Sequence, residues 1–486
     1  MPDFHLFPFP FWLVLVALVY FAIRTWQLPE SSLRLPMLVV LMTVAAWYVG
    51  DVLYNDYNGY LMEIDKTSLS NAWWEVLGFI CAFGFLAPAV HRFFNKKYLG
   101  RKSTLLALVF HGGLKSDKFQ DQIDLICRFM FAVWIGLMIV ALFRTDFDFA
   151  GLFMPYLGEK ADPWARARLG SGLDALWAAI GYFQIALTAT FGLILALSYR
   201  TVTFAIALLV TFLIFPTYIF DRTRNTMLAI FLPGFLAWVF LRIRSGVVVK
   251  VFILVLGFLA VDSWLKFVIE NRDQSTIAAA FHQTDHLKSD SPDAVRHLGL
   301  NMFEELGFIN AFIADGSYRT DWGENYFSEL VNPIPRSLWP GKPFIGIDYA
   351  VARGQGTGNN AVDATGVAAT ISTGMVGQGV VNFGRILGPL VAAILMSCWT
   401  AILARQDILG TEPGRLFLYA IGLILTFNMG RDITLLVTYP FAFGYLLLIA
   451  IQSWSTPGTS RNSKTAKAGL AAVKPSHYRI GRYVRK

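Results

Sequence analysis

The stretch Val202–Phe220, VTFAIALLVTFLIFPTYIF, is nineteen residues long and contains no charged side chain. A helix rises about 1.5 Å per residue and the hydrocarbon core of a bilayer is about 30 Å thick, so about 20 apolar residues cross it. An apolar run of this length indicates a membrane-spanning helix.

The composition extends this prediction to the whole chain of 486 residues. Hydrophobic residues make up 55% and charged residues 15%, where a soluble domain has about 25% charged residues. The mean hydropathy is +0.51, and Phe, Tyr and Trp together make up 15%. These values exclude a disordered protein, a secreted disulfide scaffold and an ordinary cytosolic enzyme, which leaves a polytopic membrane protein.

Ten further segments resemble the first one in length or apolar character. The predicted fold is therefore an all-α polytopic membrane protein with about 11 transmembrane helices and one large periplasmic loop. The eleven segments are Phe7–Ile23, Leu35–Tyr54, Ala72–Val90, Ile126–Phe143, Leu173–Leu197, Val202–Phe220, Thr226–Leu241, Val247–Phe267, Gly384–Leu403, Arg415–Met429 and Ile433–Trp454.

The charge distribution predicts the topology. Residues Trp454–Lys486 carry eight basic and no acidic side chains, so the net charge of +8 lies in this tail. Lys and Arg collect on the cytoplasmic side and bind anionic lipid there. The C-terminus is therefore predicted to be cytoplasmic and, with an odd number of helices, the N-terminus periplasmic. The interval His91–Leu125, with seven basic and three acidic residues, then falls inside. The basic balance gives no indication of nucleic-acid binding.

Four regions follow from this topology. Residues 1–267 hold transmembrane helices 1–8, residues 268–383 form the large periplasmic loop, residues 384–454 hold helices 9–11, and residues 455–486 form a basic cytoplasmic tail. The loop carries thirteen acidic and seven basic residues and several aromatic ones, and loops of this length are usually functional. Apolar residues at helical spacing predict an amphipathic helix over Arg296–Ala314.

The densest motif of the loop is Asn332–Pro343, NPIPRSLWPGKP. Its four prolines fix φ and exclude a helix, so the backbone is a rigid extended or turning segment. Such a segment would present the guanidinium of Arg336 and the ammonium of Lys342 in fixed positions, which suits phosphate or pyrophosphate binding. The alternative is an interfacial hairpin whose Trp339 and cations contact lipid headgroups.

Three more arginines lie on the predicted outer side, against the positive-inside bias. Arg222 and Arg224 lie in one turn between helices, and Arg431 in the turn between the last two. An anionic ligand would explain them. The alternative is a local structural pair with Asp221 or Asp432.

Acidic residues supply candidates for proton transfer. Asp321, Glu324 and Glu329 lie close to Arg319 in the loop and offer a general base, although acids on a loop more often form only a solvated face. Glu75 lies within an apolar segment, so it must face the bundle or water. No histidine spacing indicates a metal site.

The combination of motifs resembles the bacterial O-antigen and exopolysaccharide repeat-unit polymerases of the Wzy type. The resemblance is in the Pro-rich motif, in Val381–Gly384 opening a helix, in Arg222 and Arg224 heading a helix, and in Arg431–Asp432 before the last helix. The plan of about eleven helices with one large late periplasmic loop is also similar.

The resemblance implies a GT-C-like helical bundle in the bacterial inner membrane that acts as a glycosyltransferase. A growing polysaccharide on undecaprenyl pyrophosphate would be transferred to the non-reducing end of a new lipid-linked repeat unit, without a nucleotide sugar, metal or cofactor. The implied partners are this lipid-linked oligosaccharide, membrane lipids and, as candidates, a chain-length regulator and other polysaccharide assembly proteins. The candidate pyrophosphate ligands are Arg222, Arg224, Arg336, Arg431 and Lys342, and the candidate bases are Glu329, Asp321 and Glu324.

Two other functions are compatible with the same features. A polysaccharide ligase would share the helices, the outer loop and the arginines, and would differ only in its acceptor. A lipid-linked oligosaccharide flippase or other transporter would also be rich in helices, but transporters tend to have internal repeats with broken helices at matching positions, and the sequence reveals none.

Overall fold

The computed structural model describes most of the helical segments together with parts of the large loop. The described residues are 7–55, 57–105, 113–155, 161–164, 174–219, 224–243, 245–270, 301–331, 334–335, 337–344, 346–354, 371–410, 412–433 and 435–454.

The described part of the chain contains helices and no strand. The first half contains α1 (Phe9–Trp26), α2 (Ser31–Val44), the π-helical segment η2 (Ala45–Val49), α3 (Gly50–Tyr54), α4 (Tyr57–Glu63), α5 (Lys66–Phe94), η3 (Lys96–Tyr98), η4 (Gly113–Lys115), α7 (Asp117–Arg144), α8 (Phe149–Phe153), α9 (Asp174–Leu197) and α10 (Thr201–Ile219). The second half contains α11 (Arg224–Ala237), the π-helical segment η5 (Trp238–Arg242), α12 (Val247–Glu270), α14 (Met302–Asp315), α15 (Glu324–Val331), α16 (Ile347–Ala352), α17 (Gly374–Ile408), α18 (Pro413–Met429) and α19 (Leu435–Trp454).

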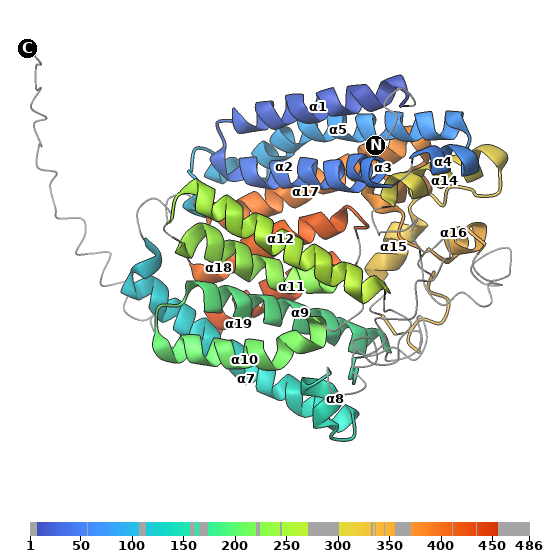
Figure 1. The fold of residues 1–486 in the computed structure, drawn as a ribbon. Coiled ribbons are helices and arrows are strands. Elements are labelled where there is room, and N and C mark those ends of the chain that lie inside the picture. The colour runs from blue at the N-terminus through green and yellow to red at the C-terminus, as the bar shows by residue number, and fades with distance from the viewer. Residues whose placement is uncertain are drawn as a thin grey trace, which may run out of the picture.

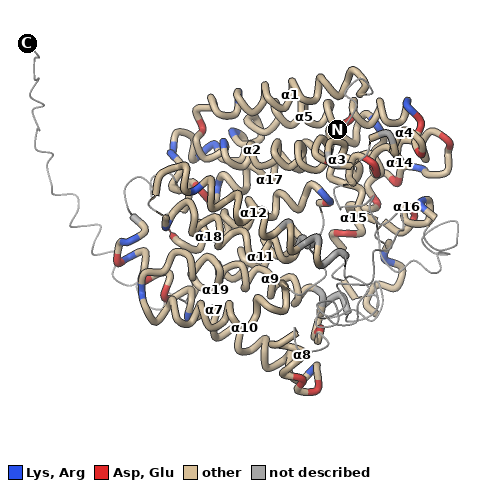
Figure 2. The backbone as a smooth tube through the Cα atoms, in the orientation of Figure 1, with Lys and Arg blue, Asp and Glu red and all other residues tan. Residues whose placement is uncertain are grey.

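Seven helical segments of the described chain are long and apolar enough to cross a membrane, and four shorter apolar helices accompany them. All eleven coincide with the segments expected from the sequence. This confirms an all-α chain with several candidate membrane-spanning helices, whereas the count of eleven spans and the orientation of the termini stay predictions. Figure 1 shows the long helices side by side, with α14, α15 and α16 together at one end of the bundle. Lys, Arg, Asp and Glu lie mainly at the two ends of the helices (Figure 2).

The large loop is docked on the bundle through α14, which lies within the predicted amphipathic range. This helix packs against α5, η2 and α17, and its apolar residues Phe303, Leu306 and Ile309 are fully buried. The buried carboxylate of Asp51 accepts hydrogen bonds from the backbone N–H groups of Phe303 and Glu304 over 2.8 and 3.2 Å. Since the first N–H groups of a helix have no partner within the helix, Asp51 both caps α14 and ties it to the bundle.

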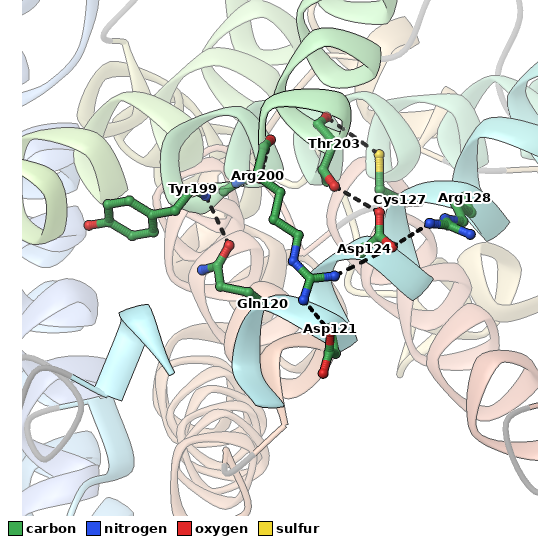
Figure 3. A network of polar contacts seen from close by, with 9 residues as sticks. Gln120, Asp121, Asp124, Cys127, Arg128, Tyr199, Arg200 and Thr203 are labelled. Carbon is green, nitrogen blue, oxygen red and sulfur yellow. Dashed lines mark hydrogen bonds and ion pairs between the residues drawn. The ribbon is translucent and has the colours of Figure 1, made fainter. Parts of the chain in front are cut away.

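A polar network joins α7 to the turn before α10 at the other end of the bundle (Figure 3). Asp124 accepts a hydrogen bond from the hydroxyl of Thr203 over 2.8 Å and pairs with Arg128 over 2.8 Å. The guanidinium of Arg200 lies between Asp121 and Asp124 and pairs with both. The charge of Arg200 is therefore matched by two carboxylates.

The chain reverses direction within α17. Gly384 has φ 76° and ψ 179°, which is not helical, so α17 consists of a short arm (residues 374–383) and a long arm (residues 385–408). In a continuous helix, residues 379 and 388 would lie about 13 Å apart along the axis. Instead, a Cβ atom added to Gly379 would collide with the backbone carbonyl of Gly388, and one added to Gly388 with that of Gly379. The short arm therefore folds back against the long arm, and the helix begins at Gly374 and not at the predicted Gly384.

Replacing Gly384 by Ala should lower the melting temperature of the purified protein in detergent by several degrees. The nearest atom to an added Cβ atom would be Cγ2 of Thr320 at 3.8 Å, so there is space for the methyl group. The cost lies in the backbone, since a non-glycine residue in this region costs about 1–3 kcal/mol.

The matched control is Gly136→Ala in α7, where an added Cβ atom meets nothing within 4 Å. Alanine is favoured over glycine inside a helix, so this variant should not lower the melting temperature. An unchanged melting temperature for Gly384→Ala would contradict a reversal that depends on glycine.

Candidate functional site

Gln378 on the short arm connects two of the predicted site regions. Its amide nitrogen donates a hydrogen bond to Oε1 of Glu329 on α15 over 2.8 Å. Its amide oxygen accepts a hydrogen bond from the backbone N–H of Ile433, in the turn before α19, over 2.9 Å. Because the oxygen is committed to a backbone donor, the NH₂ group must face Glu329. One side chain therefore ties the large loop to the turn that contains Arg431 and Asp432.

Arg431 and Asp432 both contact the residues that precede the short arm. The Nε of Arg431 donates to the hydroxyl of Ser372 over 2.6 Å. The carboxylate of Asp432 accepts from the backbone N–H of Thr373 over 3.0 Å and from its hydroxyl over 3.4 Å. Within the described residues, Arg431 and Asp432 form no ion pair with each other, so the alternative of a local pair is not what the structure has.

The first turn of the short arm is held by two further groups. The backbone N–H of Val376 donates to the hydroxyl of Tyr48 over 2.9 Å, and that of Met375 donates to the carbonyl of Gly430 over 3.2 Å. Tyr48 lies in the π-helical segment η2, and π-helical turns occur frequently at functional sites. The backbone N–H groups of Met375 and Val376, which have no partner within the helix, therefore donate to acceptors in the bundle.

The carboxyl groups of Glu329 and Asp432 have pKa values that are both raised, but to different extents. Burial, and then the nearby carboxylate of Asp432, raises the pKa of Glu329 well above its ordinary value of 4.5. Burial also raises the pKa of Asp432 to about 6, although hydrogen bonds from Ser372 and Thr373 and the charge of Arg431 oppose the shift. Burial therefore favours the protonated form of Glu329, whereas the pKa of Asp432 stays below neutral pH. Strongly shifted groups of this kind cluster at functional sites.

Asp321 lies just before α15 and is a third carboxyl group of the site. Burial raises its pKa to about 6. Its Oδ2 accepts a hydrogen bond from the side-chain amide of Asn325, its Oδ1 is buried, and the phenol of Tyr318 and the backbone N–H of Gly323 lie near the same carboxyl group. Its backbone N–H donates to the carbonyl of Val381 on the short arm over 3.3 Å. Asp321 is therefore a carboxyl group held by neighbouring donors, and its raised pKa still lies below neutral pH.

Tyr326 lies among the three carboxyl groups. Its pKa is raised by burial and then by the charges of Glu329, Asp432 and Asp321, so all three act on one phenol. Its backbone N–H donates to Oδ1 of Asn382 on the short arm over 3.3 Å. Glu329, Asp432, Asp321 and Tyr326 therefore form one site, which we call the carboxyl site.

The remaining predicted residues lie elsewhere or outside the described part. Glu324 is exposed on the first turn of α15. Lys342 is buried and donates from its ammonium to the carbonyl of Ile334 over 2.7 Å, within the Pro-rich segment itself. Arg222, Arg336 and the side chain of Arg224 lie outside the described residues.

Glu75 faces the bundle interior, as the sequence required. It is buried, and its Oε2 accepts a hydrogen bond from the side-chain amide of Asn310 on α14 over 2.7 Å. Arg385, the first residue of the long arm, donates to the carbonyl of Asn310 over 3.0 Å. Asn310 and Arg385 were not expected from the sequence, and they link α5, α14 and α17 beside the chain reversal.

Comparisons with known proteins give no match. No family model fits the chain, and no curated protein or solved structure is significantly similar to it. Within the described residues, no group of three or more His, Cys, Asp and Glu side chains could hold a metal ion. The functional argument therefore rests on the geometry and electrostatics of the carboxyl site.

Replacing Glu329 by Gln should stabilise the protein at pH 8 but not at pH 5. The raised pKa means that the folded chain binds this proton more tightly than the unfolded chain. The free energy of unfolding therefore falls as pH rises above 4.5 toward the pKa of the folded state. Gln keeps the shape of the protonated carboxyl group and cannot ionise, so the variant avoids this loss. Melting temperatures of both proteins across this pH range measure the difference.

The matched control is Glu324→Gln, which changes an exposed side chain on the same helix. It should show no gain that grows with pH. A Glu329→Gln variant that is less stable than the parent protein at pH 8 would contradict a protonated Glu329.

Proposed function

We propose that this chain is a membrane glycosyltransferase that polymerises lipid-linked oligosaccharide repeat units on the periplasmic face of a bacterial inner membrane. The observation that supports the proposal is that two separate motifs converge. Glu329 of the large loop and Arg431 of the last interhelical turn were both expected at the site, about a hundred residues apart in the chain. Gln378 links Glu329 to the backbone beside Arg431.

The reaction needs one proton acceptor and one site for a departing anion. An acceptor hydroxyl attacks the anomeric carbon of the donor, the bond from that carbon to the pyrophosphate oxygen breaks, and the pyrophosphate leaves with the electron pair. Arg431 is exposed at the edge of the carboxyl site and would neutralise the charge that develops on this leaving group. Arg222, Arg224 and Arg336 stay candidates for the same role.

The pKa values assign the proton-transfer roles. The pKa of Asp321 is about 6, so its ionised form is available at neutral pH and would accept the proton of the acceptor hydroxyl. The raised pKa of Glu329 favours its protonated form, so Glu329 would transfer a proton to a substrate oxygen. Two carboxyl groups whose surroundings push their pKa values apart are the usual arrangement for an acid and a base in one site.

A lipid-linked oligosaccharide transporter is the second candidate, because one observation favours it. The short and long arms of α17 form a discontinuous helix beside buried carboxyl groups, and transporters place their binding sites at such breaks. A protonated Glu329 would then couple transport to proton movement.

The test is glycan analysis of cells in which the gene is deleted and complemented with Glu329→Gln. Polymerase function predicts that long chains are replaced by single repeat units on their final acceptor, because glutamine cannot transfer a proton while the fold is retained. Asp315→Asn, an exposed carboxylate on the same side at the end of α14, is the matched control and should restore long chains.

The other outcomes identify the alternatives. Long polymer that accumulates on its lipid carrier and never reaches its acceptor would indicate a ligase. Repeat units that accumulate in the cytoplasmic leaflet would indicate a transporter. Normal long chains with Glu329→Gln would contradict a role for this carboxyl group in polymerisation.

A further inference from the structure

The turn Asp321–Gly323 holds an exposed tryptophan in an unfavourable backbone conformation. Trp322 has φ 51° and Gly323 has φ 96°. Glycine adopts positive φ easily, but a bulky residue with positive φ is a genuine outlier. The side chain of Trp322 is nevertheless 73% exposed, so burial of the indole does not compensate for the strain. Strained residues of this kind cluster at ligand-binding and active sites.

The strained turn is fixed against the short arm of α17. The backbone N–H of Asp321 donates to the carbonyl of Val381 over 3.3 Å. A Cβ atom added to Gly323 would lie 3.1 Å from Cζ of Phe383, so the turn is pressed against this ring. The turn that carries Trp322 is thus fixed against the short arm, and Trp322 directly follows Asp321 of the carboxyl site in the chain.

The residues that flank Trp322 in the sequence are mostly polar. This distinguishes its turn from the apolar surface of α15 and the Pro-rich segment. That surface exposes Phe327, Leu330 and Leu338, which suits contact with lipid. By contrast, the turn around Trp322 lies in a polar stretch of the chain, residues 315–324, DGSYRTDWGE. An exposed flat aromatic face on a turn rich in polar residues fits a pyranose ring, which has an apolar face of C–H groups and hydroxyls at its rim.

We infer that Trp322 binds the terminal pyranose ring of the acceptor glycan by stacking and thereby brings an acceptor hydroxyl to Asp321. The inference deepens the proposed function and rests on it, because it names the residue that would hold one of the two substrates. It gives the indole a role at a position that glycine or asparagine would occupy with less strain.

The experiment uses the purified full-length protein in detergent and one defined probe. The probe is the repeat-unit oligosaccharide released from the surface polysaccharide of the organism that encodes the chain. Saturation-transfer NMR and titration calorimetry report which ring protons contact the protein and with what dissociation constant. Trp322→Gly and Trp322→Asn should each weaken binding by at least about tenfold, because the stacking contact is lost.

Two further variants separate stacking from folding. Trp322→Phe keeps an aromatic face and should bind within about threefold of the parent protein. Trp26→Ala removes another exposed indole, at the end of α1 and 67% exposed, and should leave binding unchanged. Because Gly and Asn tolerate positive φ, the melting temperatures of Trp322→Gly and Trp322→Asn should equal or exceed that of the parent protein.

The outcomes separate the inference from the function on which it rests. If the parent protein binds the oligosaccharide and the Gly and Asn variants bind it equally well, the assignment of Trp322 is wrong while the glycan substrate stands. If the parent protein does not bind the oligosaccharide, both the proposed substrate and this assignment are contradicted.

Discussion

The reversal of the chain at Gly384 is the constraint on which the candidate site depends. It returns the short arm of α17 into the bundle, where Asp432 and Tyr48 hold its start. Only in this position can Gln378 reach both Glu329 and the backbone of Ile433. Without the reversal, the residues before Gly384 would extend away from the bundle, and the large loop would lack its contact with the last interhelical turn.

Burial of several carboxyl groups within one region gives the site its chemical character. Charged groups are costly to remove from water, and like charges placed close together cannot all remain ionised. In this chain the free-energy cost of ionisation differs between Asp432 and Glu329. Asp432 receives hydrogen bonds from Thr373 that stabilise its ionised form, whereas the raised pKa of Glu329 favours its protonated form. A site that holds a proton on one carboxyl group and leaves Asp321 ionised is prepared for proton transfer at neutral pH.

The sequence predicted the apolar helices well and the site only in part. Runs such as Val202–Phe220 are governed by length and hydropathy, which are local properties. Glu329 and Arg431 were expected from separate motifs, but nothing in the sequence indicated that Gln378 joins them, because that contact depends on tertiary packing. The Gly-rich stretch before Gly384 resembles a loop by composition, so the short arm was missed. The sequence did offer one sign that Gln378 matters, because it is an isolated polar residue in an apolar stretch, but that sign does not identify its partners.

Infrared spectroscopy of the carboxyl groups tests the central claim most directly. The protonated carboxyl group of Glu329 should contribute a carbonyl band at pH 7 that is absent from the spectrum of Glu329→Gln and that disappears from the parent protein only at higher pH. Isotopic labelling of glutamate would separate this band from those of Asp321 and Asp432. The account predicts that the labelled band is present at pH 7. A protonated-carboxyl region at pH 7 that is identical in the two proteins would show that Glu329 is ionised and would contradict the account.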